Sequence, residues 1–151
     1  MSNIDMIRPA VPFETTIHVR DTCLCLCAQR AARTLARRFD IALKPLGITN
    51  GQFSLMMSLN RPKPPGMGPV AALLAMDRTT LTAALKPLER RGLVRIEPDP
   101  ADRRGRLLML TPQGQALLAD AVPIWTSTHA RVDAMLPDGG EALRRDLQRL
   151  A

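Results

Sequence analysis

The chain has 151 residues, of which 46% are apolar, and it carries a formal net charge of +7. A chain of this length is expected to form a single domain over residues 1–151, with enough buried surface to fold without disulfides or a metal. Arg supplies all but three of the 21 basic residues, and its planar guanidinium suits phosphate and guanine. The charge balance indicates attraction to a polyanion, although a general bias towards Arg explains it equally well.

The sequence shows no sign of secretion or membrane insertion. Its first residues, MSNIDMIRPAVPF, contain no apolar run of signal-peptide length, and no segment approaches the roughly 20 apolar residues of a membrane span. We therefore expect a cytoplasmic protein in which residues 1–13 form an unpaired arm and the three Cys are thiols.

Two helices are expected before the centre of the chain. The first covers about 14–46 and, at ~1.5 Å per residue, would be about 50 Å long, which is too long for one small domain to cover. The second runs from Thr49 to about Asn60, because Thr49 and Gln52 have the spacing of a capping box. Its apolar residues are expected in the core: Phe53, Met56, Met57 and Leu59.

A pair of short helices is expected after the Pro- and Gly-rich loop 61–68. The first starts at Pro69 and buries a face formed by Val70, Leu73 and Leu74, and Asp77 is placed to cap the second. In the second helix the leucines at i, i+4 and i+7 are expected to be buried: Leu81, Leu85 and Leu88. The opposite side and the N-terminal end carry the residues that would read DNA in the major groove: Arg78, Thr79, Thr80, Thr82, Ala83 and Lys86.

A hairpin is expected next, with strands at 93–97 and 106–110 around the loop 98–105. Arg103, Arg104 and Arg106 can place guanidinium groups in a narrow minor groove, where the potential is most negative. Asp102 is expected to brace a neighbouring Arg. The competing interpretation is a solvated hairpin tip, and the helix pair that precedes the hairpin favours the DNA-binding interpretation.

Two further helices are expected at the C-terminal end. Thr111 and Pro112 begin a long helix that reaches about Leu136, and a Pro-Asp-Gly-Gly turn ends it. The last helix carries leucines at i, i+4 and i+7, so it too is expected to bury one face: Leu143, Leu147 and Leu150.

The segment MDRTTLTAALKPLERRGLV, followed by DPADRRGRLLMLTPQG, resembles the multiple-antibiotic-resistance regulator (MarR) family. The wing pattern, Asp-x-Arg, five residues and Leu-Thr, is present as Asp102, Arg104, Leu110 and Thr111. The resemblance covers nearly the whole chain. It implies a mainly α fold with a small antiparallel β-wing, in which 49–111 form a winged helix-turn-helix and the helices of 14–46 and 112–151 hold a dimer together.

The same resemblance implies a function. It implies a homodimer that binds a pseudo-palindromic operator in double-stranded DNA, usually as a repressor, and that is released by a small molecule or by oxidation. It assigns the recognition role to the exposed residues of the second short helix, from Arg78 to Lys86, and the wing role to Arg103 and Arg104.

Three cysteines alternate near the N-terminus: Cys23, Cys25 and Cys27. In one helix Cys23 and Cys27 share a face while Cys25 points about 200° away, so a helix cannot aim all three at one metal. We expect no metal or other cofactor, and we expect the cysteines to be small buried residues near the dimer seam. The alternative is a thiol switch in which Cys23 or Cys27 meets its twofold mate and oxidises.

Trp125 and His129 lie four residues apart on the late helix, where they could line a crevice for a small aromatic effector. The favoured interpretation is that Trp125 is a core or interface residue and His129 is exposed. An enzyme is not expected, because the sequence Gly66-Met67-Gly68 lacks the preceding strand and the following Lys-Ser/Thr of a phosphate loop. A winged-helix module that binds protein is a further alternative, which a weak dependence of binding on salt would reveal.

Overall fold

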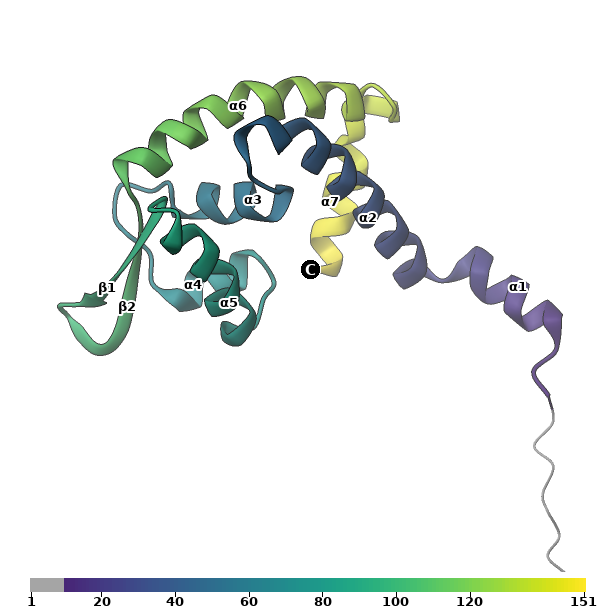
Figure 1. The fold of residues 1–151 in the computed structure, drawn as a ribbon. Coiled ribbons are helices and arrows are strands. Elements are labelled where there is room, and N and C mark those ends of the chain that lie inside the picture. Colours follow the sequence, from purple (N-terminus) through teal and green to yellow (C-terminus); the bar gives the residue numbers. More distant parts are fainter. Residues whose placement is uncertain (1–9) are drawn as a thin grey trace, which may run out of the picture. The chain divides into compact units, whose positions relative to one another are not determined.

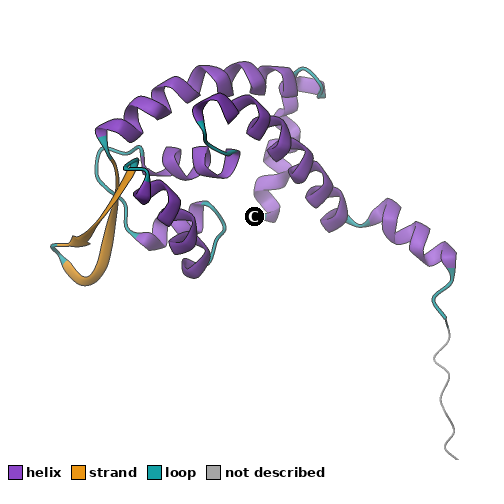
Figure 2. Ribbon diagram, viewed as in Figure 1, coloured by secondary structure: helices purple, strands orange, loops and turns teal. Residues whose placement is uncertain are grey.

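A computed structural model describes residues 10–151, so most of the expected N-terminal arm lies outside the described residues. The chain divides into two compact units, Met1–Leu35 and Ala36–Ala151, and each is described by itself. Helices predominate and one hairpin supplies the only sheet of the described part (Figures 1 and 2). None of the helices within residues 10–151 is long and apolar enough to cross a membrane.

The first unit contains a break in the helix that the sequence predicts over 14–46. Helix α1 (Phe13–Thr22) ends at Cys23, whose backbone is extended (φ −71°, ψ 108°), and α2 (Leu24–Leu43) then begins. The Cys23 N–H closes α1 by donating to the Val19 carbonyl at 2.9 Å. Its Sγ accepts the Leu26 N–H at 3.4 Å, at the start of α2. The prediction of one continuous helix is therefore wrong, because Cys23 ends one helix and caps the next.

Helix α1 buries none of its residues, although it and its flanks are apolar in places. The exposed large apolar side chains of this unit include Val11, Phe13, Val19 and Leu24. A group of exposed apolar side chains of this size is typical of a surface that another molecule covers.

The second unit has a core made largely of leucine. Its largest fully buried side chains are Leu43, Leu55, Met56, Val70, Leu81, Leu85, Leu88, Leu93 and Leu108. They come from the end of α2, α3 (Asn50–Leu59), α4 (Met67–Leu73), α5 (Arg78–Arg90), the segment between α5 and the hairpin, and the hairpin itself. A short 3-10 turn, η1 (Lys44–Leu46), joins α2 to α3.

Local signals place α3 as expected, and both hydrogen bonds of the Thr49–Gln52 capping box are present. Met57, however, is 40% exposed instead of belonging to the core. Helix α4 begins at Met67, two residues before Pro69, and it ends at Leu73 because the chain turns through Ala75 at a positive φ of 52°. Leu73, expected on the buried face, is 63% exposed.

The hairpin is longer than predicted. Strand β1 (Val94–Asp99) pairs antiparallel with β2 (Asp102–Leu110), in register from Val94–Leu110 to Pro98–Arg106, and the register shifts after Pro98. Residues 98–105 are therefore mostly strand, with a tight turn at 100–101. Pro98 is tolerated because β1 is an edge strand and need not donate a further ladder bond. The other edge of β2 is held by a bond from the Leu108 N–H to the Pro65 carbonyl at 2.9 Å.

Helix α6 (Pro112–Asp133) begins as predicted, with the Thr111 hydroxyl accepting the Gly114 N–H at 3.0 Å, but it ends three residues earlier than Leu136. A turn, η2 (Pro137–Gly140), leads into α7 (Glu141–Leu150), and Asp138 accepts the Ala142 N–H at its start. The apolar stripe of α7 is not buried, because no part of the described chain covers it. The exposed fractions are 47% for Leu143, 46% for Leu147 and 71% for Leu150.

Candidate nucleic-acid interface

Helix α5 has one side fixed in the core and the other uncovered. Leu81, Leu85 and Leu88 are completely buried, and α5 packs against α4 and β1. At its start, Asp77 Oδ1 accepts the Thr80 N–H at 2.7 Å, and this bond lowers the pKa of the Asp77 carboxyl. The helix is therefore capped by a carboxylate and presents its polar side outward.

The residues predicted to read DNA all lie on that outward side or at its N-terminal end. The structure leaves each of them exposed: Arg78, Thr79, Thr80, Thr82, Ala83 and Lys86. The Thr82 hydroxyl donates to the Arg78 carbonyl at 2.8 Å, so its proton is engaged while its methyl group and oxygen lone pairs remain available. The Arg78 guanidinium lies beside Gly68, since a Cβ at Gly68 would be 3.6 Å from Arg78 Nη2.

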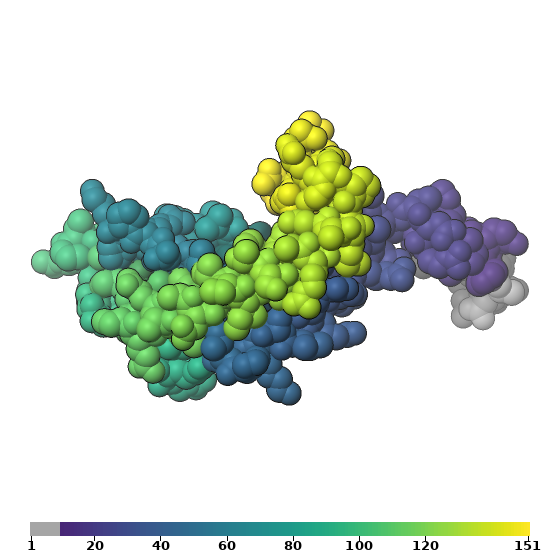
Figure 3. Space-filling model, turned by 90° about the horizontal axis from the view of Figure 1, so that it is seen from above, coloured from purple at the N-terminus to yellow at the C-terminus, as the bar shows by residue number. Residues whose placement is uncertain are grey.

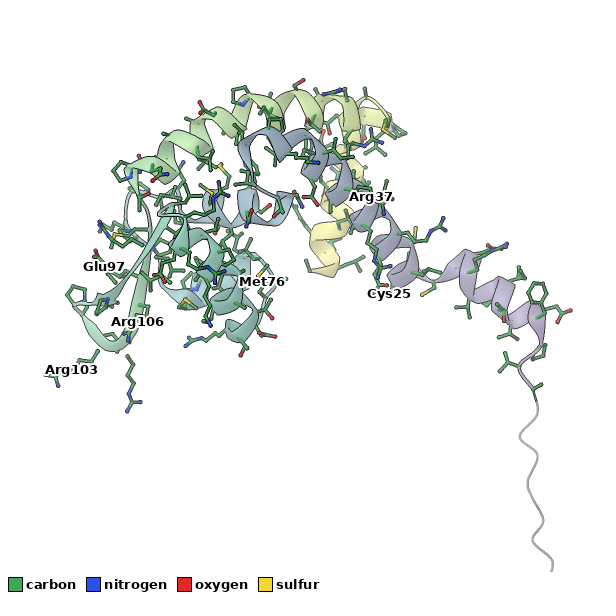
Figure 4. All side chains as sticks on the ribbon, viewed as in Figure 1. Cys25, Arg37, Met76, Glu97, Arg103 and Arg106 are labelled. Atoms are coloured by element: carbon green, nitrogen blue, oxygen red, sulfur yellow. The ribbon has the colours of Figure 1, made fainter. Side chains whose placement is uncertain are left out.

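The hairpin carries a second group of exposed cations, Arg103, Arg104 and Arg106. Figure 4 labels Arg103 at the outer end of the hairpin and Arg106 farther along it. Asp102 Oδ1 accepts the backbone N–H of Arg104 at 3.0 Å, and within residues 10–151 it forms no ion pair with a guanidinium. Asp102 therefore braces the backbone of Arg104 at the turn and does not pair with any of the three guanidinium groups.

A close joint connects the end of α5, the hairpin and the start of α6. The Thr111 hydroxyl donates to the Gly92 carbonyl at 2.6 Å, and the Thr111 N–H donates to the Leu93 carbonyl at 3.1 Å. A Cβ at Gly114 would lie 2.0 Å from the Leu93 carbonyl oxygen, so only Gly fits there. Gly114 was not among the predicted site residues; a Gly three residues after a capping Thr is the signal that could have identified it.

A separate cavity of about 420 Å³ lies beside Trp125 in the second unit. Its walls are Phe53, Ser54, Met57, Ser58, Leu73, Val122 and Trp125. Met57 and Leu73, which were expected in the core, are thus exposed to this cavity. Trp125 stacks on Phe53 with ring centroids 6.1 Å apart.

The structure puts Trp125 in the cavity wall but does not place His129 there. The His129 ring lies 4.7 Å from the Trp125 ring, and its Nδ1 is 3.1 Å from Asp133 Oδ2. The Asp133 carboxylate also accepts a bond from Arg144, and these contacts, with Arg144 the larger influence, lower the pKa of Asp133. His129 is half-buried, so the expectation of an exposed side chain is wrong.

The three cysteines were expected to be small buried residues near a dimer seam, and within the single chain none of them is buried. Cys25, which Figure 4 labels, and Cys27 are exposed free thiols. Cys23 is half-buried at the break between α1 and α2. In the part of the chain that the structure describes, no three His, Cys, Asp or Glu side chains are grouped as metal ligands. The prediction that Cys23 and Cys27 share a face assumed one continuous helix, and the break at Cys23 removes that assumption.

Comparisons with known proteins agree on one family. The MarR family model matches residues 48–105. The transcriptional regulator HosA of Escherichia coli O111:H- is 42% identical over 82 residues, which are 53% of this chain and 59% of HosA, so the match spans little more than half of that relative.

Solved structures extend the likeness over most of the chain. The M. tuberculosis transcriptional regulator MosR, in complex with DNA, is 39% identical with a TM-score of 0.78 over 85% of this chain and 92% of MosR. The repressor CouR, bound to a 23-mer DNA duplex, is 28% identical with a TM-score of 0.78 over 94% and 99%. CouR from Rhodococcus jostii RHA1 bound to p-coumaroyl-CoA is 25% identical with a TM-score of 0.72 over 85% and 91%. With its helix pair, arginine-tipped hairpin and long flanking helices, the chain belongs to the MarR family of winged-helix transcriptional regulators.

Proposed function

We propose that this chain is a sequence-specific DNA-binding transcriptional regulator, and that it acts as a repressor on a pseudo-palindromic operator. The observation that carries the proposal is the uncovered polar side of α5, whose opposite side is locked by three completely buried leucines. A helix held in this way can enter the major groove without losing its own packing. The repressor role draws support from the likeness to the repressor CouR.

The exposed residues of α5 divide by chemistry. Thr79, Thr82 and Ala83 are short, which allows the helix to approach base edges closely, and their methyl groups suit contact with thymine methyls. Lys86 carries a cation suited to a phosphate or to guanine. Arg78, which rests beside Gly68 in the free chain, is assigned to a phosphate near the start of α5; the base-reading role requires it to move away from α4.

The hairpin supplies contacts that depend less on sequence. Arg103, Arg104 and Arg106 are assigned to the minor groove or its phosphates, where a narrow groove concentrates negative potential. The bond from the Arg104 N–H to Asp102 stiffens the turn that presents them, and the joint at Thr111 holds the hairpin relative to α5.

We assign the active form to a homodimer. One chain offers one α5 and one hairpin, whereas a palindromic operator requires two of each at the spacing of two half-sites. The exposed apolar side chains of α1 and its flanks, and the leucine stripe of α7, are the surfaces assigned to the partner copy. Contact with the partner copy covers apolar side chains that are exposed in the single chain.

The cavity at Trp125 is assigned to a small effector that releases DNA. Its walls are mainly apolar, and Trp125 with Phe53 offers flat aromatic surface, which suits an aromatic ring. A neighbour of the same fold, CouR, is known bound to p-coumaroyl-CoA. His129 is assigned a supporting role, because it contacts Trp125 from outside the cavity.

A second mode of release is oxidation of the cysteines, favoured by the exposure of Cys25 and Cys27 and by the position of Cys23 at a helix break. Two thiols and one hydrogen peroxide would give a disulfide and two waters. Operator affinity of the triple Cys→Ser variant, measured with and without peroxide, tests this mode. A peroxide response that survives in the variant excludes it.

Salt dependence of binding tests the DNA-binding proposal. We expect the affinity for a labelled duplex, measured by fluorescence anisotropy, to fall steeply as salt rises, because Lys and Arg release counterions from phosphate. Arg104→Ala should lower the slope of log affinity against log salt by about 1 for each hairpin of the homodimer that contacts the duplex, whatever the sequence of the duplex. Arg145→Ala on α7, an exposed Arg away from α5 and the hairpin, is the matched control and should not. Binding that is insensitive to salt would instead indicate a protein-docking module.

A further inference from the structure

A second cavity, of about 250 Å³, lies between the last turns of α2 and the C-terminal half of α6, within the second unit. Its lining residues are Arg38, Ile41, Ala42, Thr128 and Arg131. It shares none of these with the cavity at Trp125 and contains no aromatic side chain. The two cavities use different residues of α6, so a ligand here would not compete directly with one at Trp125.

The Thr128 hydroxyl is the unexplained feature of this cavity. Thr128 is only 3% exposed, and its Oγ1 is buried without a hydrogen-bond partner among residues 10–151. Thr126, two residues earlier on the same helix, instead donates to the Val122 carbonyl at 2.9 Å. A buried hydroxyl without a partner is unfavourable and calls for an explanation. An acceptor brought by a ligand would supply the missing bond.

Two arginines complete the site. Arg38 and Arg131 are exposed side chains on its rim, and within the described part of the chain neither forms an ion pair. Arg131 makes a single long bond, from Nε to the Ser127 carbonyl at 3.5 Å, which leaves its terminal nitrogens for a ligand. Guanidinium groups bind carboxylates through short, charge-assisted bonds. A pair of them beside an unused hydroxyl favours an anion.

We propose that this cavity binds a small aliphatic carboxylate. The carboxylate group lies between Arg38 and Arg131 and accepts the Thr128 O–H, and the hydrocarbon part packs on Ile41 and Ala42. At roughly 30 Å³ for each water-sized group, the cavity holds about eight non-hydrogen atoms, the size of hexanoate. The Thr128 oxygen is covered in the free chain, so binding displaces a side chain at the rim. The proposal does not depend on DNA binding.

Isothermal titration calorimetry with the full chain tests the site, with hexanoate and the neutral hexanamide as probes at low salt. We expect saturable binding of hexanoate and at least tenfold weaker binding of hexanamide. Arg38→Gln and Arg131→Gln should each weaken hexanoate at least fivefold, and Thr128→Val about threefold, because each removes one donor to the carboxylate. Thr126→Val is the matched control and should bind as the wild type does.

The outcomes separate cleanly. Absence of saturable hexanoate binding, equal binding of hexanamide, or unchanged affinity in Thr128→Val and both Arg variants would overturn the proposal. Inorganic phosphate binding as tightly as hexanoate would overturn the assignment to a carboxylate. Thr128→Val keeps the shape of the side chain and removes the unpaired hydroxyl, so its melting temperature should be no lower than that of the wild type, which separates lost binding from lost folding.

Discussion

Helices α5 and α7 carry leucines at the same spacing, but only those of α5 are buried. In α5, leucines at i, i+4 and i+7 are completely buried, whereas the leucines at the same spacing in α7 are between 46% and 71% exposed. The periodicity states which face is apolar and not what covers it. The α5 unit completes its core within one chain, whereas the apolar stripe of α7 stays exposed, and we propose that a partner copy covers it.

Truncation of a buried leucine gives the largest expected effect. Leu85→Ala should lower the free energy of unfolding by about 2–5 kcal/mol, because Leu85 is completely buried and its loss leaves a cavity. Leu143→Ala on α7, at protein concentrations that keep the chain monomeric, should change it by less than about 0.5 kcal/mol. Urea denaturation followed by circular dichroism measures both. Equal losses would remove the contrast between the two helices.

A methyl group at the joint next to α5 gives the second effect. Gly114→Ala should destabilise the chain by about 1–3 kcal/mol, because the new Cβ would lie 2.0 Å from the Leu93 carbonyl oxygen and the hairpin must move. Gly51→Ala in α3, where the nearest atom is 3.9 Å away, is the control and should be neutral or slightly stabilising. A Gly114→Ala protein as stable as the wild type would mean that the joint is loose.

A charge on the exposed leucine stripe of α7 tests whether a partner copy covers that stripe. Leu147→Glu should weaken dimerisation by more than about tenfold. The free energy of unfolding of the monomer should stay nearly unchanged, because the Leu147 side chain is expected to make its apolar contact only in the dimer. Gln148→Glu adds the same charge beside the stripe and serves as the control. Analytical ultracentrifugation over a dilution series measures the dissociation constants. A dimer that Leu147→Glu leaves intact would place the interface elsewhere.

The smallest effect concerns the cap of α5. The bond from the Thr80 N–H lowers the pKa of Asp77 in the folded chain, so Asp77 contributes stability above its unfolded pKa of about 3.9, and that contribution is lost as pH falls through the folded value. Asp77→Asn keeps an acceptor without the titration. The wild type should therefore lose stability relative to Asp77→Asn below about pH 4, measured by urea denaturation. Parallel curves for the two proteins would contradict the cap's role.

The sequence predicted most of the second unit because its signals are local. Thr49, Asp77 and Thr111 cap helices through bonds within three residues, so a short stretch of sequence is sufficient to place each helix start. Burial of Leu81, Leu85 and Leu88 followed from periodicity together with the covering helices.

The wrong predictions depended on contacts that a local pattern does not contain. Pro98 and the charged residues after it indicated a loop, yet the pairing of β1 with β2 continues past Pro98–Arg106 to Asp99–Asp102. Met57 and Leu73 had the periodicity of core residues, but a cavity lies where their neighbours would be. The break at Cys23 has neither Gly nor Pro beside it. The Cys23 sulfur accepts the Leu26 N–H at the start of α2, and the helical periodicity of the segment does not reveal such a cap.

The two parts of the candidate DNA-binding surface, α5 and the hairpin, lie next to each other. The hairpin and α5 lie at the same end of the second unit (Figure 1), and the space-filling view in Figure 3 shows α6 running along its surface. Because buried leucines hold α5 and the Thr111 hydrogen bonds hold the hairpin, we expect one chain to contact one half-site.

Selection from a random pool of double-stranded DNA is the most direct test of the proposal that two such surfaces act together. We expect enrichment of a pseudo-palindrome whose half-sites are centred about one helical turn, roughly 10 base pairs, or a multiple of it apart. Changes at Thr79 or Thr82 should alter the selected bases, and Arg104→Ala should not. A pool without an enriched sequence, or enrichment of a single half-site without symmetry, would exclude sequence-specific binding by a homodimer.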